Sequence, residues 1–141
     1  PFNAVKWLSY AANMASGDFA RRRGFDDALL LTSDGLVLEG PTFSIAWVAG
    51  GHLETPSLGL GILPSITRAV LLGEAAPRLG LPVAEGIFPL SRLLEADEAL
   101  ALSTVKEVTP LAAVGEHPMP QGEVTGRLAQ AFRDIVAAET G

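Results

Sequence analysis

Tight turns join short apolar runs in the first half of the chain, a pattern that predicts antiparallel strand pairs. Asp27–Thr32 and Leu36–Leu38 flank a Ser-Asp-Gly turn at 33–35. Phe43–Val48 is followed by a Gly-Gly turn at 49–52. Asp-Gly and Gly-Gly pairs between apolar runs are typical of β-hairpins. We therefore expect a mixed α+β fold built on a mostly antiparallel sheet, and not a purely parallel, doubly wound sheet.

Capping residues and helical apolar spacing indicate the remaining elements. Serine and glycine stand where helix caps belong, and Pro77 should end or kink the helix that contains it. We expect helices from Ser9 to Gly24 and over Ile66–Leu79, Ser91–Ala96 and Val124–Ala138. We expect further strands at Pro1–Lys6, Leu53–Thr55, Pro82–Phe88, Ala99–Ser103 and Thr109–Val114.

The composition fits a single domain without disulfides. Of the 141 residues, 48% are apolar and 18% are charged, which is enough apolar material for a sizeable core. The absence of cysteine excludes disulfides and Cys-ligated metal sites, and the two histidines stand far apart in the sequence. We therefore expect one domain over residues 1–141, no metal site and a reducing, cytoplasmic setting.

The net charge of −6 argues against a nucleic-acid partner, because phosphate neutralisation requires many Lys and Arg on one face. The longest basic block is Arg21-Arg22-Arg23. No apolar run is long enough to cross a membrane, so we expect no membrane partner. The chain begins Pro1-Phe2-Asn3, with neither Met nor a signal-peptide pattern, which suggests a start partway through a gene product.

Two residues at the ends of predicted strands could carry chemistry. Lys6 ends an apolar run beside Trp7, and burial near aromatic rings would suit a lysine to a Schiff-base role. The alternative is an ordinary surface lysine. Glu39 lies between the strand Leu36–Leu38 and Gly40-Pro41, where it is either solvated at the turn or partnered in a cleft.

Two segments could bind an anion. A glycine-rich loop from Gly59 leads into a helix start at Ile66-Thr67, where free backbone N–H groups and a hydroxyl suit a phosphate. The loop lacks Gly-Lys-Ser/Thr, so it is not a P-loop, and its alternative is a capped helix after a flexible loop. Ser103-Thr104-Val105 at a strand end offers similar groups, or is an ordinary turn.

The order of these motifs resembles that of the class IV, fold-type IV pyridoxal-phosphate enzymes. This family includes branched-chain aminotransferases, D-amino-acid aminotransferases and aminodeoxychorismate lyases. The similarity extends from Lys6 to the last predicted helix, over nearly the whole chain. The matching segments are Lys6–Asn13, Asp26–Leu31, Asp34-Gly35, Glu39-Gly40, Thr55-Pro56, Gly61–Arg68, Ser103-Thr104 and Glu107–Pro110.

The resemblance implies roles for four residues around the ring of pyridoxal 5′-phosphate (PLP). Lys6 matches the catalytic lysine that forms a Schiff base with the cofactor and moves a proton during the reaction. Tyr10 matches a tyrosine near the phenolic oxygen of the cofactor. Glu39 matches the glutamate that holds a proton on the pyridine nitrogen, and Leu63 matches the leucine that packs on the ring.

The resemblance also implies a phosphate site and a contact to the substrate. Ile66 and Thr67 match the helix start that binds phosphate through backbone N–H groups and a hydroxyl. Thr104 matches a threonine that touches the phosphate from the turn. Thr104 and the N–H group of Val105 are expected near the substrate carboxylate.

The sequence departs from the family pattern at three places. Residues 41–45 read Pro-Thr-Phe-Ser-Ile where relatives carry a Ser-Gly-rich segment ending in Asn. Ser65 stands in place of a glycine before the Ile-Thr pair, and Ser103 stands where branched-chain enzymes carry a glycine. These differences concern the identity of the substrate more than the use of the cofactor.

The resemblance implies that residues 1–141 form the C-terminal cofactor-binding domain, a mostly antiparallel sheet or pseudo-barrel flanked by helices. The resemblance further implies that the small N-terminal domain of the family is absent from residues 1–141. In the family, that domain supplies an arginine to the phosphate and one wall of the substrate pocket. We therefore expect the isolated chain to retain PLP weakly and to be inactive.

The function that the resemblance implies is a PLP-dependent aminotransferase, which moves an amino group between an amino acid and a 2-oxo acid. Its partners would be these small molecules and a second copy of the chain in a homodimer. One alternative is an aminodeoxychorismate lyase, which forms 4-aminobenzoate and pyruvate with the same lysine. Another is a truncated, inactive domain that serves only for dimerisation.

Overall fold

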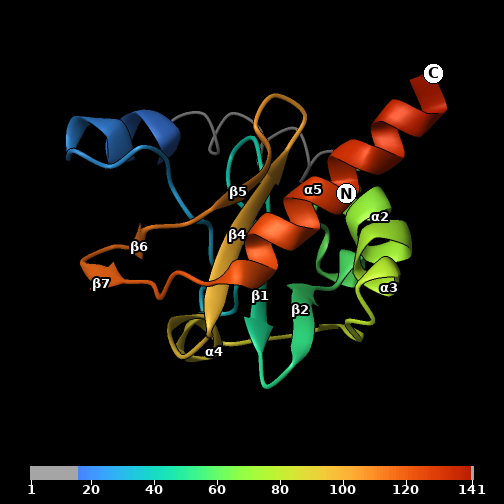
Figure 1. Ribbon diagram of the computed structural model, residues 1–141. Helices are drawn as coiled ribbons and strands as arrows, with labels where there is room; N and C mark the ends of the chain where they lie inside the picture. Colours follow the sequence, from blue (N-terminus) through green and yellow to red (C-terminus); the bar gives the residue numbers. More distant parts are fainter. Residues whose placement is uncertain (1–15, 141) are drawn as a thin grey trace.

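The computed structural model describes residues 16–140, and a five-stranded sheet forms its centre (Figure 1). The strands of this sheet are β1 (Ser44–Ala49), β2 (His52–Pro56), β3 (Val83–Gly86), β4 (Glu98–Ser103) and β5 (Glu107–Pro110). Their order is β3-β2-β1-β4-β5, and every neighbouring pair is antiparallel except β2 and β3. This arrangement agrees with the predicted mixed fold and mostly antiparallel sheet.

Helices and a small second sheet surround these strands. The helices are α2 (Ile66–Val70), α3 (Ala76–Arg78), α4 (Leu90–Leu94) and α5 (Glu123–Thr140), with a 3-10 turn η1 (Leu58–Leu60) and a helix over residues 16–22. Strands β6 (Ala113–Val114) and β7 (His117–Pro118) pair separately from the main sheet. Figure 1 shows α5 lying across β4 and β5. Within residues 16–140, no helix is long and apolar enough to cross a membrane.

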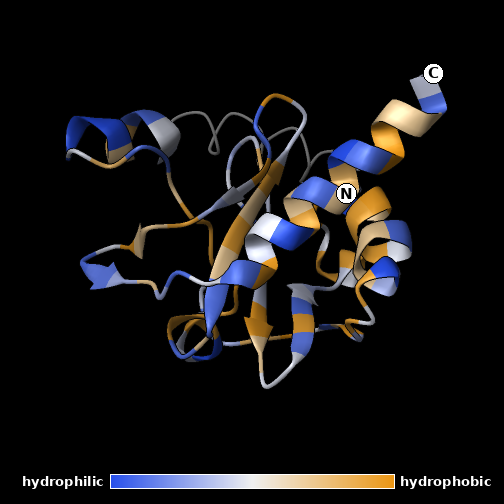
Figure 2. Ribbon diagram, viewed as in Figure 1, coloured by the Kyte–Doolittle hydropathy of each residue, from blue (hydrophilic) through white to orange (hydrophobic). Residues whose placement is uncertain are grey.

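The sheet buries apolar side chains on both faces because successive residues of a strand point to opposite sides. In β1, Ala46 and Val48 face the core shared with α5, whereas Ile45 and Trp47 face the core that covers the opposite side. The first core contains Leu71, Leu100, Leu102, Leu128, Phe132 and Ile135, and the second contains Val37, Leu93, Ala96, Ala99 and Met119. Figure 2 shows the apolar residues gathered along β1, β4 and the inner side of α5.

Two of the predicted strand regions are only partly regular. Asp27–Thr32 and Leu36–Leu38 form one isolated bridge, Leu31 to Val37, because the N–H of Leu30 bonds the carbonyl of Glu39 instead of that of Leu38 and so ends the regular ladder. The predicted strand Thr109–Val114 is split. β5 ends at Pro110, which has no N–H group to continue a ladder, and the chain then leaves the sheet toward β6.

Pro77 acts differently from the expectation that it would end or kink its helix early. The helix continues to Arg78, and its middle part, η2 (Leu71–Ala75), is π-helical. The N–H of Ala76 bonds the carbonyl of Leu71, five residues back. A proline ring clashes with the carbonyl four residues before it, so widening the turn that precedes Pro77 lets the helix continue.

A polar network lies beside the second core. Trp47, fully buried in β1, donates its indole N–H to Glu54 at 2.8 Å. Arg92 of α4 donates two hydrogen bonds to the same carboxylate, at 2.8 and 2.9 Å. The bonds from Arg92, and secondarily the bond from Trp47, hold the pKa of Glu54 below its ordinary value despite its burial. The network therefore ties α4 to the central strands.

This network predicts part of the acid sensitivity of the fold. A carboxyl group with a lowered folded pKa stabilises the protein above its unfolded pKa, and this stability is lost as pH falls through the folded pKa. We expect E54Q to flatten the decline in unfolding free energy below about pH 4.5. Denaturant unfolding of wild type and E54Q between pH 6 and 3 measures how the unfolding free energy of each changes with pH. The exposed Glu116→Gln variant should follow the wild type, and an E54Q curve parallel to wild type would refute the prediction.

Candidate active site

Glu39 lies at the centre of the candidate site. Its carbonyl accepts a hydrogen bond from the N–H of Leu30, which fixes the backbone after the irregular hairpin. The side chain is buried, and its Oε2 atom accepts a hydrogen bond from the N–H of Leu63 at 3.1 Å. Burial raises the pKa of Glu39, and the bond from Leu63 partly opposes that effect. No Lys, Arg or His among residues 16–140 forms an ion pair with it.

Gly40 fixes the chain directly after Glu39. Its N–H bonds the carbonyl of Phe43 at 2.9 Å, closing a tight turn. A Cβ atom at Gly40 would lie 1.9 Å from the Phe43 ring, far inside any tolerable contact. The ring of Phe43 therefore packs on the position that only glycine leaves open, and this contact holds the turn that presents Glu39.

Replacing Gly40 with Ala should destabilise the fold, because the new methyl group and the Phe43 ring cannot share the space. Overpacking of this kind costs about 1–3 kcal/mol. Thermal unfolding of the purified protein measures the effect. Gly126→Ala provides the matched control, since a Cβ there meets no atom within 4 Å and α5 gains a better helix former. An unchanged melting temperature for G40A would contradict the packing described above.

The start of α2 lies next to Glu39, because Leu63 connects the two. Ser65 caps the helix by accepting a hydrogen bond from the N–H of Arg68 at 3.1 Å. Its hydroxyl also lies 3.3 Å from the hydroxyl of Ser44 at the start of β1. Thr67 is 5% exposed, and its hydroxyl forms no hydrogen bond with any residue that the structure describes. A free hydroxyl at a helix start suits an anion.

Arg68 attaches the start of α2 to the neighbouring strands, a role that we did not predict from the sequence. The side chain is 5% exposed, and its Nη2 atom donates to the carbonyl of Pro56 at 3.1 Å and to Glu85 at 2.5 Å. Arg68 thus joins the start of α2 to the end of β2 and to β3. The sequence signal was a single basic residue inside the otherwise apolar run that follows Thr67.

The turn between β4 and β5 presents Thr104 and Val105. Ser103 accepts a hydrogen bond from the N–H of Lys106 at 3.0 Å, and Thr109 donates to the Lys106 carbonyl at 2.9 Å. These bonds fix the turn from both sides, and Val105 at its tip is 90% exposed. α2 packs against β4, so the turn that follows β4 lies near α2.

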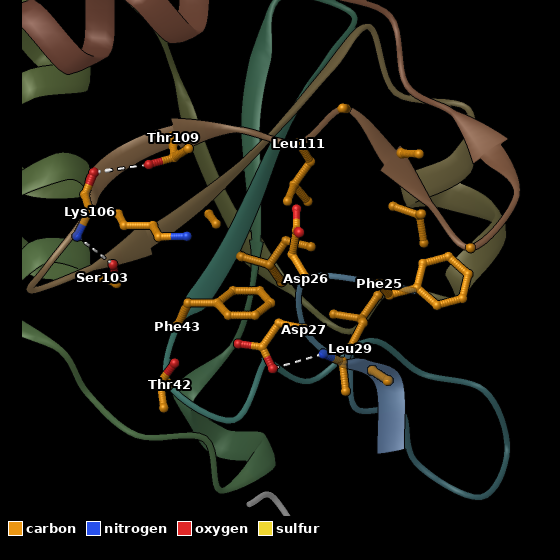
Figure 3. A pocket seen from close by; sticks show the side chains of 18 of the residues that line it. Phe25, Asp26, Asp27, Leu29, Thr42, Phe43, Ser103, Lys106, Thr109 and Leu111 are labelled. Carbon is orange, nitrogen blue, oxygen red and sulfur yellow. Dashed lines mark hydrogen bonds between the residues drawn. The ribbon is translucent and has the colours of Figure 1, made fainter. Parts of the chain in front are cut away.

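A pocket of about 840 Å³ opens beside the turn (Figure 3). Residues 103–106 form one wall, Phe25–Leu29 form another, and Thr42 and Phe43 lie between them. The pocket adjoins the Glu39 site through Phe43, which packs on Gly40. Within residues 16–140, no group of three or more His, Asp or Glu side chains is arranged to hold a metal ion.

The predicted site residues thus fall into three groups. Glu39 and Leu63 are joined by a hydrogen bond, and Thr67 follows at the helix start. Thr104 and Val105 line the neighbouring pocket. Glu39, Leu63 and Thr67 do not line that pocket. Ile66, at the start of α2, is 84% exposed, and Leu63 is 52% exposed, so both offer apolar surface to a bound group. Lys6 and Tyr10 lie outside the described residues.

Comparisons with known proteins identify the family of the chain. The model of the amino-transferase class IV family matches residues 1–114. The branched-chain-amino-acid aminotransferase of Escherichia coli strain K12 is 32% identical over 135 residues, which cover 94% of this chain and 43% of that protein. The aminodeoxychorismate lyase of Bacillus subtilis is 36% identical over 104 residues, covering 72% of this chain and 35% of that protein.

Solved structures show the same fold. The PLP form of branched-chain amino acid aminotransferase from Thermobaculum terrenum superposes with a TM-score of 0.86 at 34% identity, covering 93% of this chain and 43% of that chain. The chain spans less than half the length of these relatives. The family match over most of its residues shows that the chain belongs to the class IV aminotransferases.

Proposed function

We propose that this chain is the cofactor-binding domain of a PLP-dependent aminotransferase, which transfers an amino group from an amino acid to a 2-oxo acid. The observation that carries the proposal is Glu39, a buried carboxylate whose hydrogen-bond donor among the described residues is a neutral N–H. The proposed domain spans residues 1–141, and the small N-terminal domain of the family would lie in sequence outside this chain. That region would complete the substrate pocket, so the isolated chain would be inactive.

Glu39 fits the nitrogen end of the PLP ring. When bound, PLP supplies an electron sink for the electrons released at the Cα atom of the amino acid. Glu39 would hold a proton on the ring nitrogen through a charge-assisted hydrogen bond, which is strong in a buried site. The half-exposed side chain of Leu63, whose N–H already contacts Glu39, would cover one ring face.

The start of α2 fits the phosphate end. Thr67, whose residue is 5% exposed, offers a hydroxyl without a partner in the described part of the chain, and the backbone N–H groups of Ile66 and Thr67 begin a helix. A phosphate at this position gains hydrogen bonds and a favourable helix dipole. Thr104, exposed on the β4–β5 turn, would add a further hydroxyl.

Lys6 and Tyr10 complete the proposed site. Lys6 would hold PLP through the aldehyde carbon of the cofactor, and its ε-amine would serve as the acid and base that moves a proton at Cα of the substrate. Tyr10 would lie near the phenolic oxygen of the cofactor. Both roles rest on the motif that surrounds these residues in the sequence, Lys-Trp-Leu-Ser-Tyr.

The test is chemical trapping of Lys6 in protein expressed from its complete reading frame. The protein is incubated with PLP, reduced with borohydride and digested, and mass spectrometry then locates the phosphopyridoxyl adduct. We expect the adduct on Lys6 and its loss in Lys6→Ala. A folded protein that carries no adduct at Lys6 would refute the proposal and would favour the alternative of an inactive domain that serves only for dimerisation.

The second candidate is an aminodeoxychorismate lyase, favoured by the 36% identity to the Bacillus subtilis enzyme. It would use the same lysine and the same cofactor. Incubation with an amino acid and 2-oxoglutarate, compared with 4-amino-4-deoxychorismate, separates the two, because only the lyase releases 4-aminobenzoate and pyruvate. The proposal further includes a homodimer in the cytoplasm, and light scattering after size-exclusion chromatography would measure the mass of the assembly.

A further inference from the structure

Lys106 places a positive charge at the pocket beside the proposed cofactor site. It lines the 840 Å³ pocket, and Figure 3 shows its ammonium group extending toward Phe43. It forms no ion pair with any residue from 16 to 140. The proposed cofactor contacts do not use it, so its charge is available to a ligand.

The backbone of Lys106 is held in place. Its N–H donates to Ser103 at 3.0 Å, and its carbonyl accepts from Thr109 at 2.9 Å. Glu107, which follows, has φ of 55°, a left-handed conformation that non-glycine residues rarely adopt. Since both backbone groups are occupied, the group that Lys106 offers is the side-chain ammonium, carried on a fixed turn.

The other charged residues of the pocket are arranged differently. Arg23 lies over the ring of Phe19, with 4.2 Å between its Cζ atom and the ring centroid. Asp27 accepts a hydrogen bond from Ala28 at 2.9 Å and lies 3.9 Å from Arg21. Asp26 also lines the pocket, on the wall opposite the turn. The turn side of the pocket therefore carries one positive charge, from Lys106, whereas the opposite wall carries Arg23 together with Asp26 and Asp27.

We propose that Lys106 binds a carboxylate of the substrate and so contributes to specificity; the proposal rests on the function inferred above. Amino acids and 2-oxo acids all carry a carboxylate, and an ammonium group binds a carboxylate through a charge-assisted hydrogen bond. Thr104 and Val105, expected near the substrate carboxylate, lie on the same turn. The bound group is either the α-carboxylate common to all substrates or a second carboxylate on an acidic side chain.

The test measures binding without turnover. Isothermal calorimetry on PLP-loaded protein, expressed from its complete reading frame, uses two unreactive acids, glutarate with two carboxylates and 4-methylpentanoate with one. We expect Lys106→Ala to weaken glutarate binding about tenfold, the size of one charge-assisted hydrogen bond. Lys106→Arg should retain most of the affinity. Arg127→Ala, which removes an exposed positive charge on α5, should leave it unchanged.

The two acids distinguish the sources of the carboxylate. Equal weakening of both acids by K106A assigns Lys106 to the α-carboxylate, and weakening of glutarate alone assigns it to a second carboxylate. Unchanged affinities in K106A, equal losses in R127A, or no binding of either acid by wild type would overturn the proposal. Failure here is distinct from failure of the proposed function, because the borohydride adduct at Lys6 is measured without either acid.

Discussion

Replacing Glu39 with Gln should slow amino-group transfer about 100-fold or more while leaving most of the PLP affinity in place. Glutamine fills the same buried space and can still accept the hydrogen bond from Leu63. It cannot supply the negative charge that keeps the ring nitrogen protonated in the proposed site. The loss should therefore fall on the chemical step, because the proposed phosphate contacts of Thr67 and Thr104 do not involve Glu39.

Single-turnover kinetics and PLP titration separate the two effects. The chemical step is followed by absorbance after mixing the PLP-loaded protein with an amino acid, and affinity is measured by titrating the apoprotein with PLP. Glu74→Gln, an exposed substitution in the helical run after α2, should match wild type in both. A normal chemical step in E39Q, or a loss confined to PLP affinity, would remove Glu39 from its proposed role.

The same substitution, which slows the reaction, should raise the unfolding free energy of the PLP-free protein at neutral pH. Burial raises the folded pKa of Glu39, so the folded state binds this proton more tightly than the unfolded state does. Unfolding free energy then declines as pH rises from about 4.5 through the raised pKa. E39Q lacks this decline and should be the more stable apoprotein at neutral pH. Denaturant unfolding between pH 4 and 8 measures the unfolding free energy of both apoproteins. If the two free energies changed with pH in parallel, the prediction would be wrong.

The sequence indicates candidate site residues but does not indicate which groups hold them in place. Glu39 stands out because a carboxylate follows an apolar run, and Thr67 stands out because it starts a helix after a glycine-rich loop. Neither pattern indicates that the N–H of Leu63 would contact Glu39, since 24 residues separate them. The Ser44–Ser65 contact likewise depends on how β1 and α2 pack, which local periodicity does not contain.

Fold prediction missed two irregularities of the backbone and one long-range helix cap. The hairpin at 27–38 is irregular because Leu30 bonds the carbonyl of Glu39 instead of that of Leu38, and the π-helical segment depends on the ring of Pro77. The start of α5 was predicted at Val124, close to the observed Glu123, from apolar spacing alone. Its cap is Glu98 of β4, which accepts hydrogen bonds from the N–H groups of Val124 and Thr125. A partner 26 residues away leaves no mark in the local sequence.

Replacing Arg68 with Met should lower the unfolding free energy by about 2–3 kcal/mol and weaken PLP binding as well. Methionine fills much of the space of the arginine stem but leaves the buried carbonyl of Pro56 without its donor, a cost of about 1–3 kcal/mol. The ion pair with Glu85 adds little, because the Glu85 side chain is 48% exposed. Most of the loss therefore comes from the hydrogen bond and the packing around the guanidinium.

The effect on PLP follows from the position of Arg68 directly after Thr67. Arg68 joins the start of α2 to the end of β2, so its removal frees the helix start that would hold the phosphate. Arg78→Met, on the exposed end of the same helical run, removes an equal charge without that link and should match wild type. Denaturant unfolding and the rate of PLP release measure the two effects. If R68M lost stability yet released PLP at the wild-type rate, Arg68 would support the fold without positioning the phosphate site.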